Sequence, residues 1–431
     1  MLFRSKHARP VSKNISLVAR LDIPGGGQVT VQNGLAFVGH MDAPHGTTII
    51  DVKDPANPKI LKRIMLDDDL SHTHKVRVAG NIMITNVEQA QRHQLRRGEK
   101  LPEVSKKLEA ELGRPPVDSE IAEALGLAES KLAAVRRFLQ NGYNDGGFRV
   151  WDISDPADPK LLSYVRTHGF GVHRFDMDEN YAYISTEMEG YVGNILVIYD
   201  LADPRNPVEV SRWHMPGQHL AGGETPTWSG YKNRLHHALR VGDEMWAAVW
   251  NAGFQVVDIS DITKPRTIAA HNYHPPFPEP THTVLPCEQL IDGRRIAVVV
   301  DEEHDHEPGR LHAFLWVFDV TDLDNIHALS AFDVSEMESP WSREKGRFGA
   351  HQFREKLDNT LVYATWFSGG LRVIDIADPF LPREIAHYIP APPAGFPSPQ
   401  SNDVDVDENG YIYLLDRNAG LDILRMDKIT S

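Results

Sequence analysis

The 431-residue sequence contains a single cysteine, Cys287, and no long apolar run. One cysteine excludes an internal disulfide and fits a reducing compartment, so we expect a cytoplasmic protein. No stretch approaches the roughly 18 apolar residues of a membrane span, and the basic N-terminus lacks the apolar segment of a secretory signal. We therefore expect no membrane partner.

The chain also has fewer basic than acidic residues. The chain has 45 Lys and Arg residues against 60 Asp and Glu residues, which gives a net charge of −15. A chain so acidic is repelled by phosphate backbones, so no nucleic-acid partner is expected. The sequence also lacks a GxxxxGK[ST] loop, a GxGxxG turn after a strand and a GxSxG elbow. Nucleotide hydrolysis and nucleophilic serine chemistry therefore have no support.

One pattern recurs along most of the chain: a β-branched strand, an Asp and a Pro-containing turn. An example is FRVWDISDPADP, and a pair of short strands such as HKVRV-AGN-IMITN precedes each copy. Four short strands per unit, repeated seven times, predict an all-β fold, a seven-bladed β-propeller. The copies begin at Thr47, Phe148, Leu196, Phe254, Leu315, Leu371 and Leu421.

The two ends of the chain predict how the propeller closes. The last unit lacks an outer strand, whereas SLVARLDI at Ser16 resembles an outer strand with no unit before it. Pairing of these N- and C-terminal strands would close the ring and remove exposed edges. We expect an N-terminal arm over residues 1–15 and the propeller over 16–431. These strand repeats resemble the LVIVD-repeat β-propeller family, and that resemblance implies the fold but no particular chemistry.

Residues 90–143 interrupt the second blade with a helical pattern. Part of the segment, ELGRPPVDSEIAEALGL, resembles the short helix-turn-helix of bacterial sigma factors. Its basic and acidic residues are nearly balanced, which argues against DNA binding. A loop between the second and third strands of a blade lies at the same end as the start of the first strand. We therefore interpret the insertion as a lid or as a homodimer contact.

Aligning the first strands of the units places a polar residue at one register, and most of these residues are histidines. First strands line the central channel of a propeller, so we expect the side chains to converge near its axis. At the fourth unit, His236 and His237 compete for the position. The aligned residues are Gln28, His74, His173, His237, His282, His351 and Asn402.

Several imidazoles in one ring predict a divalent transition metal, namely Fe, Cu, Zn or Mn. We expect the ligands to be His74, His173, His237 and His351. His282 is an alternative ligand or an acid/base group, and His236 is a further catalytic candidate. Three or four protein ligands would leave a coordination position for water or substrate.

Long loops on the histidine face are expected to bind a small-molecule substrate. Trp228, Trp341 and Phe277 are the predicted substrate-binding residues, and Glu187, Tyr231 and Arg234 are catalytic candidates beside His236 and His282. Further acidic candidates on this face include Glu88 and Glu302. We interpret the run EEHDHEPGRLH, which begins at Glu302, as a solvated loop at the channel mouth.

Together these features predict a metal-dependent enzyme that acts on a small organic substrate, with an oxidoreductase or oxygenase favoured. A lyase or hydrolase at the same site is the first alternative, and a non-catalytic propeller that binds a ligand or a protein is the second. The ring is similar in arrangement to those of carotenoid-cleaving oxygenases, the selenium-binding-protein/methanethiol-oxidase group and manganese-dependent propeller lyases.

Overall fold

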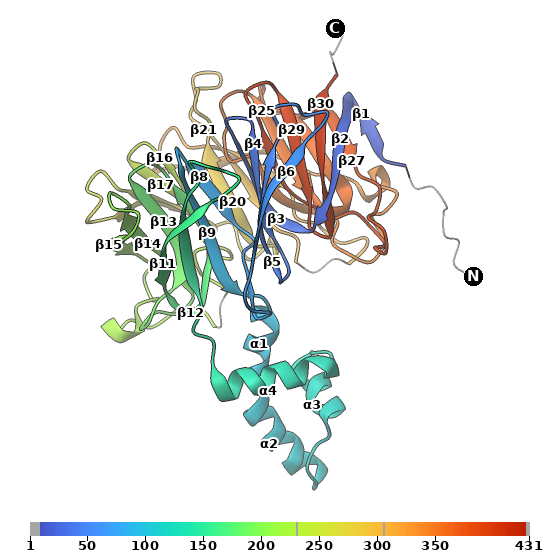
Figure 1. Ribbon diagram of the computed structural model, residues 1–431. Helices are drawn as coiled ribbons and strands as arrows, with labels where there is room; N and C mark the ends of the chain where they lie inside the picture. The colour runs from blue at the N-terminus through green and yellow to red at the C-terminus, as the bar shows by residue number, and fades with distance from the viewer. Residues whose placement is uncertain (1–8, 230–231, 305–306, 428–431) are drawn as a thin grey trace.

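The computed structural model describes residues 9–229, 232–304 and 307–427, and it has the all-β fold that the sequence predicts. Short antiparallel strands follow one another in sequence and form small twisted sheets that stand side by side (Figure 1). The first such sheet, in strand order, contains β3 (Gly26–Gln32), β4 (Leu35–His40), β5 (His45–Asp51) and β6 (Lys59–Met65).

The next sheet is larger because Gly171 of one four-strand group pairs with Glu88 of the preceding group. Nine strands are thereby joined. They are β7 (Ser71–His72), β8 (Val76–Ala79), β9 (Ile82–Gln89), β10 (Gly147–Asp152), β11 (Lys160–Arg166), β12 (His168–Met177), β13 (Tyr181–Glu187), β14 (Asn194–Asp200) and β15 (Val208–Trp213).

The following strands repeat the same meander. One four-stranded sheet holds β16 (His237–Val241), β17 (Glu244–Ala248), β18 (Phe254–Asp258) and β19 (Arg266–His271). Another holds β20 (Thr281–Pro286), β21 (Ile296–Asp301), β22 (Leu315–Asp319) and β23 (His327–Phe332).

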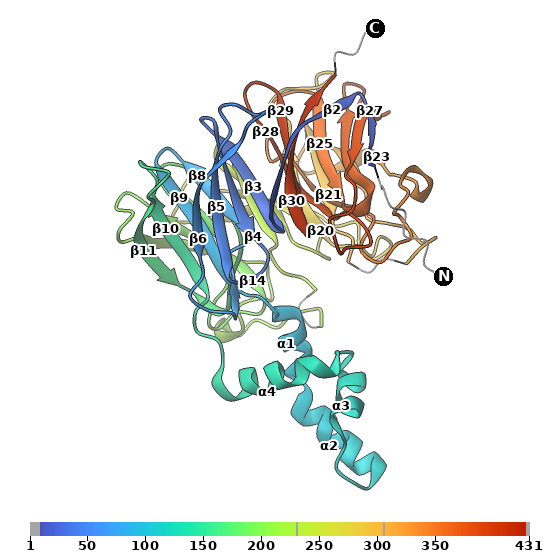
Figure 2. The same cartoon turned by 45° about the vertical axis from the view of Figure 1, so that its right-hand side comes forward.

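The N-terminal strands pair with strands near the C-terminus (Figure 2). Strand β1 (Val11–Lys13) extends the sheet of β24 (Ala350–Phe353), β25 (Leu361–Trp366), β26 (Gly370–Asp375) and β27 (Arg383–Ile389). Strand β2 (Ile15–Pro24) pairs with β30 (Ala419–Met426) in the sheet that also contains β28 (Ser401–Val406) and β29 (Tyr411–Asp416). Both N-terminal strands thus lie in sheets that are otherwise built from strands near the C-terminus.

The first strand of each group faces the first strands of its neighbours. Contacts run from β3 to β8, β12, β16, β20, β24 and β28 in turn, and β28 also contacts β3. The spaces between sheets are filled by fully buried aromatic and aliphatic side chains, among them Trp246, Trp366 and Phe148. Burial of these side chains supplies the main stabilisation of the fold.

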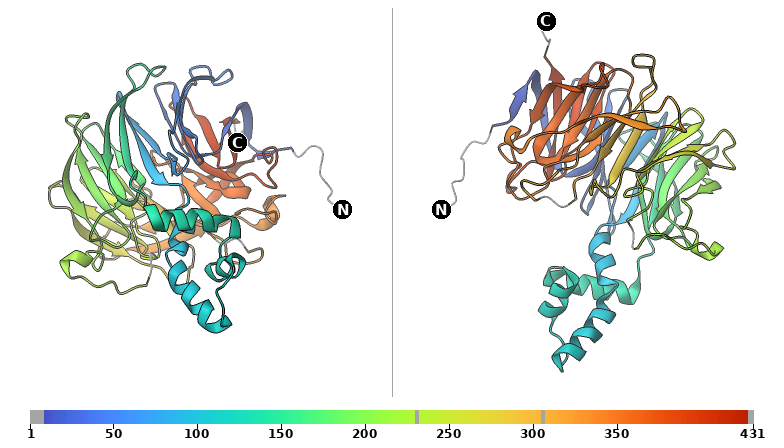
Figure 3. Two further views of the ribbon diagram at one scale, coloured as in Figure 1. Left: turned by 60° about the horizontal axis from the view of Figure 1, so that its bottom comes forward. Right: turned by 180° about the vertical axis from the view of Figure 1, so that it is seen from behind.

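The insertion joins β9 to β10 and projects from one end of the sheets (Figures 1 and 3). Its apolar residues form a core of their own, which includes Leu95, Ile121 and Val135 and takes in Phe170 of β12. Phe138 also contacts Phe170, with 5.3 Å between ring centroids. The helices are α1 (Arg92–Gly98), α2 (Leu101–Leu112), α3 (Asp118–Leu125), η1 (Glu129–Lys131) and α4 (Leu132–Asn141); short 3₁₀ turns elsewhere are η2 (Leu220–Gly222), η3 (Glu336–Glu338) and η4 (Phe367–Gly369).

Candidate metal centre

A β-bulge recurs at one position of the inner strands. In β20, for example, Thr281 pairs with Asp301 and Thr283 with Val300, which leaves His282 as the extra residue. A bulge bends the strand and redirects the side chain of the extra residue. The same shift isolates Gly27, His173, His351 and Asn402, and one extra residue also lies between the pairs made by His72 and Val76.

These positions, together with His236 directly before β16, bring five imidazoles into one arc. Neighbouring ring centroids lie 5.3, 4.7, 4.2 and 4.5 Å apart. We call these residues the histidine ring; in order they are His74, His173, His236, His282 and His351. His72 stacks on the first member of the ring, with 4.1 Å between centroids.

The ring position in the fourth group belongs to His236, whereas the sequence alignment placed His237 there. The N–H of His236 donates to the Ala248 carbonyl, while His237 pairs with the same Ala248 in the strand ladder. Successive strand residues face opposite sides, so Nδ1 of His237 lies 3.3 Å from Glu355 and the side chain is absent from the histidine pocket. Similarly, Gly27 rather than Gln28 takes the bulged position of β3.

The residue after each bulged position forms a second polar layer beneath the ring. Thr283 donates to Gln352 over 2.7 Å, and Nη2 of Arg174 donates to Glu355 over 2.5 Å. These bonds satisfy buried polar groups and hold the inner strands together. The layer consists of Gln28, Lys75, Arg174, His237, Thr283, Gln352 and Asp403.

Hydrogen bonds fix the tautomer of four ring members. Nδ1 of His236 faces the His282 carbonyl at 2.9 Å, and Nδ1 of His351 faces the Asn402 carbonyl. Carbonyl oxygens only accept, so both Nδ1 atoms carry the proton in the neutral ring. Nδ1 of His173 faces the Glu88 carboxylate at 3.0 Å.

Nδ1 of His282 also carries the proton, and its acceptor is a hydroxyl oxygen. This Nδ1 lies 2.8 Å from the Thr283 hydroxyl, which already donates its own proton to Gln352. The hydroxyl therefore accepts from His282. All four rings consequently present a bare Nε2, which is the form in which a neutral histidine binds a metal.

Two of the bare nitrogens lie close to each other, and a carboxylate lies near the other two. Nε2 of His173 and Nε2 of His236 are 2.8 Å apart. The carboxylate of Glu302 lies 4.0 Å from Nε2 of His282 and 3.8 Å from Nε2 of His351. Arginine N–H groups approach the same acceptors, Arg92 at His173 over 3.3 Å and Arg174 at His282 over 3.4 Å.

His74 differs from the other ring members. The side-chain N–H of Asn86 points to Nδ1 of His74 over 3.2 Å, and the amide is oriented by its bond from Lys75 N–H to its oxygen. Nε2 of His74 lies 3.9 Å from Glu88. Within the described ranges, two groups have ligand atoms mutually within 4.8 Å: His72, His74 and Glu88, and His236, His282 and Glu302.

The charge state of the ring is set by burial. Burial, together with the positive charge of Arg92, lowers the pKa of His173 well below its usual range. Burial likewise lowers the pKa values of His236, His282 and His351. Burial acts to raise the pKa of Glu302, but the hydrogen bond from His304 and the charge of Arg347 outweigh it, so that pKa lies well below its usual range. The site therefore combines neutral imidazoles with an ionised carboxylate.

The ring forms the floor of a pocket of ≈ 690 Å³ that also contains residues not singled out in the sequence. Trp250 and His304 line it, as do arginines from α1 and from three loops. Arg234, a catalytic candidate, is among the lining residues. The arginines are Arg92, Arg96, Arg97, Arg234, Arg347 and Arg417.

The other candidates on this face lie elsewhere. Glu187 accepts the N–H of Phe170 over 3.0 Å and pairs with Arg96 at the base of the insertion. Phe277 packs edge-on against Trp316, with 4.7 Å between centroids, and Trp228 and Trp341 lie outside the pocket lining. Tyr231 falls outside the described residues. The packing of Phe277 on Trp316 of β22 removes apolar surface of both rings from water.

Among its described residues, the run that begins at Glu302 is the expected exposed loop only over residues 307–311, and its ends, Glu303 and His312, are buried. Glu303 is 1% exposed, and His312 lies 2.9 Å from its carboxylate. Glu302 pairs with Arg347 over 2.8 Å. Ion pairing is what permits buried carboxylates, and composition alone does not show the partners.

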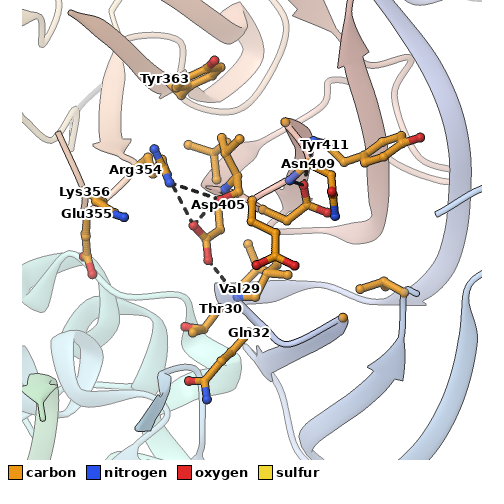
Figure 4. Close-up of a pocket in the computed structure, with 18 of the residues that line it drawn as sticks. Val29, Thr30, Gln32, Arg354, Glu355, Lys356, Tyr363, Asp405, Asn409 and Tyr411 are labelled. Atoms are coloured by element: carbon orange, nitrogen blue, oxygen red, sulfur yellow. Dashed lines mark hydrogen bonds and ion pairs between the residues drawn. The ribbon is translucent and has the colours of Figure 1, made fainter. Parts of the chain in front are cut away.

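The larger cavity, ≈ 1360 Å³, lies at the opposite end of the inner strands (Figure 4). Three of its acidic side chains, Asp403, Asp405 and Asp407, accept main-chain N–H groups. Asp405 accepts the N–H of Val31 over 2.7 Å, and Nε of Arg354 is 3.8 Å from the same carboxyl group. No histidine is among its described lining residues. The smaller pocket is therefore the candidate site.

Comparisons with known proteins agree with this architecture. A chain in the crystal structure of a mitotic checkpoint complex is similar with a TM-score of 0.56 at 9% identity, covering 99% of each chain. The WD40 β-propeller domain of Doa1 is similar with a TM-score of 0.52 at 8% identity, covering 96% of this chain and 97% of that chain. Such likenesses concern the fold alone, and the class they define is the β-propeller.

The sequence repeats identify a narrower group of proteins than the similarity of fold does. The LVIVD repeat model matches residues 142–167, 175–214 and 242–271, so the resemblance to LVIVD-repeat β-propeller proteins is confirmed. A search of curated proteins found no significant match. None of the helices in the described ranges combines the length and hydrophobicity that a membrane span requires.

Proposed function

We propose that the protein is a metal-dependent enzyme and that His173, His236, His282 and His351 hold a divalent transition metal through Nε2. The observation that carries this proposal is the set of four Nδ1–H groups committed to oxygen acceptors, which leaves four bare Nε2 atoms facing one pocket. Metal-binding histidines characteristically donate their second ring N–H in this way. Glu302 is a further metal ligand at the same site or a general base beside it.

The proposed substrate is a small organic molecule, because the pocket volume of ≈ 690 Å³ falls within the range of small-molecule sites. A metal bound there would polarise a substrate oxygen or activate water or dioxygen. Iron or copper would favour oxidation, and zinc or manganese would favour a lyase or hydrolase. The two carboxylates beside the ring, Glu88 and Glu302, suit either class.

Elemental analysis of protein purified without an affinity tag tests this proposal. We expect about one Fe, Cu, Zn or Mn ion per chain, and we expect the ion to be lost in His173→Ala. His271→Ala is the matched control, because this histidine packs against Phe254 at 5.7 Å and is remote from the pocket lining. A wild-type protein that stays metal-free after growth with each metal would contradict the proposal and favour a non-catalytic binding propeller.

The same proposal requires a closed channel, and we infer a seven-bladed propeller whose ends join through β2 and β30. The continuous series of contacts between inner strands, from β3 round to β28 and back to β3, supports this inference. The antiparallel register of Ile15 with Met426 supports the closure. The cytoplasmic location stays a prediction from the sequence.

The insertion is proposed to close the pocket. Its first helix contributes Arg92, Arg96 and Arg97 to the lining, and Arg92 pairs with Glu88 beside the ring. The alternative prediction, a homodimer contact through the projecting helices α2 to α4, is tested by light scattering. A dimer mass that persists without residues 99–141 would exclude the insertion as the contact.

A further inference from the structure

The pocket above the histidine ring is strongly basic, although the chain as a whole is acidic. Eight of its lining side chains are Lys or Arg, and three are Asp or Glu. The net charge of the chain is −15, so the local excess of positive charge runs against the composition. Concentrated charge of one sign in a cleft attracts a ligand of the opposite sign.

Three of the pocket arginines are neutralised within the protein. Arg92 pairs with Glu88, Arg96 pairs with Glu187, and Arg347 pairs with Glu302. These pairs hold α1 and two loops in place around the mouth. The charges of these three arginines are therefore already compensated within the protein.

Arg234 is different, because it is a buried cation without an anion. It is 3% exposed, and its guanidinium lies 3.9 Å above the Trp250 ring. Among the residues that the structure describes, none forms a hydrogen bond or an ion pair with this guanidinium. Burial and the nearby charges of Arg92 and Arg96 lower the pKa of Arg234 well below its usual range.

Arg372 shows how the same fold treats a structural arginine. It is fully buried, it donates to the Gly369 carbonyl over 2.8 Å, and it pairs with Glu384 over 2.8 Å. A buried charge normally has such partners because its desolvation is costly. Arg234 lacks them and faces the pocket instead.

Arg417 lies in the same lining. Its Nη1 donates to the Asn402 side-chain oxygen over 3.3 Å, a neutral acceptor. Burial and Arg347 lower the pKa of Arg417 to about 10. Lys75 is buried nearby and donates to the Gly27 carbonyl over 2.9 Å, again a neutral acceptor. Three cations thus line one pocket, and no carboxylate of the described residues is bonded to any of them.

We infer that this pocket binds an anion, and that Arg234 and Arg417 hold a carboxylate or phosphate group of the substrate above the histidine ring. Planar guanidinium groups bind both oxyanions through paired N–H bonds, and both bonds are strengthened by charge. The assignment of the anion as substrate rests on the proposed enzymatic function. The anion site itself does not depend on a metal.

Calorimetric titration of the metal-free full-length protein tests the inference. The two probes are inorganic phosphate and benzoate, at low ionic strength. We expect saturable binding of at least one probe, weakened at least tenfold in Arg234→Gln. Phosphate binding alone assigns a phosphorylated substrate, and benzoate binding alone assigns a carboxylic acid. Failure of both probes to bind, or equal binding by the variant, would overturn the inference.

Two further variants distinguish loss of anion binding from loss of folding. Arg205→Gln is the matched control, since Arg205 is exposed on the Asp-Pro turn after β14, and it should bind as the wild type does. Arg417→Gln should also weaken binding and serves if Arg234→Gln unfolds. A protein that binds the anion but never a metal would contradict the enzyme proposal and support the anion site. A protein that binds a metal but neither anion would contradict the anion site and support the enzyme proposal.

Discussion

Nε2 of His173 and Nε2 of His236 lie 2.8 Å apart, although Nδ1 of each ring already faces an oxygen acceptor. In their neutral forms both Nε2 atoms carry lone pairs, and two lone pairs at this distance repel each other unless they share a cation. Burial lowers the pKa of both imidazoles, which disfavours a proton in that role. The metal ion proposed above would satisfy both nitrogens.

The adjacent histidines of β16 provide a paired test of the register. His236→Asn removes a ring nitrogen and should reduce metal content to background. His237→Asn changes a side chain directed at Glu355 and should leave metal content within about 20% of the wild type. Elemental analysis of both purified variants measures this difference. Loss of metal in His237→Asn alone would restore the register expected from the sequence.

Glu88 orients the ring from one side, because its carboxylate faces Nδ1 of His173 and Nε2 of His72, both at 3.0 Å. We expect Glu88→Gln to weaken metal affinity about 10- to 100-fold, the usual cost of losing a carboxylate partner of a ligand. Competition with a chromogenic chelator measures the affinity. Unchanged affinity would show that the carboxylate has no orienting effect. Glu179→Gln, an exposed acidic residue, is the control.

The base of the insertion depends on Arg96, which pairs with Glu187 and lies 4.5 Å above the Phe170 ring. Arg96→Gln should loosen α1 and increase chymotrypsin cleavage within residues 92–141 several-fold, with little change in thermal stability of the sheets. Arg97→Gln is the adjacent control, because Arg97 donates to Gly126 inside the insertion. Equal cleavage of the two variants would contradict this anchoring role.

His312 should make stability depend on pH. Burial acts to lower its pKa, but bonds to Glu303 and Glu336 outweigh burial and raise that pKa to about 9. A histidine whose pKa is higher in the folded than in the unfolded chain stabilises the fold fully below about pH 6.5, and this contribution is lost as pH rises through about 9.

Urea unfolding at pH 6.5, 8 and 9.5 should therefore show a falling midpoint in the wild type. The fall should be smaller in His312→Gln, which has no proton to lose over this interval. His327→Gln replaces a half-exposed histidine on β23 and should leave the wild-type slope unchanged. Parallel slopes for the wild type and His312→Gln would contradict the prediction.

The sequence predicted the repeated strands and most of the ring because strand alternation and turn residues are local signals. It missed the register at His236 because two adjacent histidines both contact Ala248 through the main chain, and the sequence pattern does not distinguish them. It also missed the positions of the rim side chains. Phe277 packs on Trp316, and buried Glu302 pairs with Arg347, through contacts between loops distant in sequence.

The most direct test of the central claim is X-ray absorption at the metal edge of the loaded, tag-free protein. We predict a first shell of nitrogen and oxygen at about 2.0–2.2 Å with the outer-shell scattering of three or four imidazoles, reduced by one imidazole or lost in His282→Asn. A spectrum without imidazole scattering, or one unchanged by that substitution, would contradict a metal held by the histidine ring.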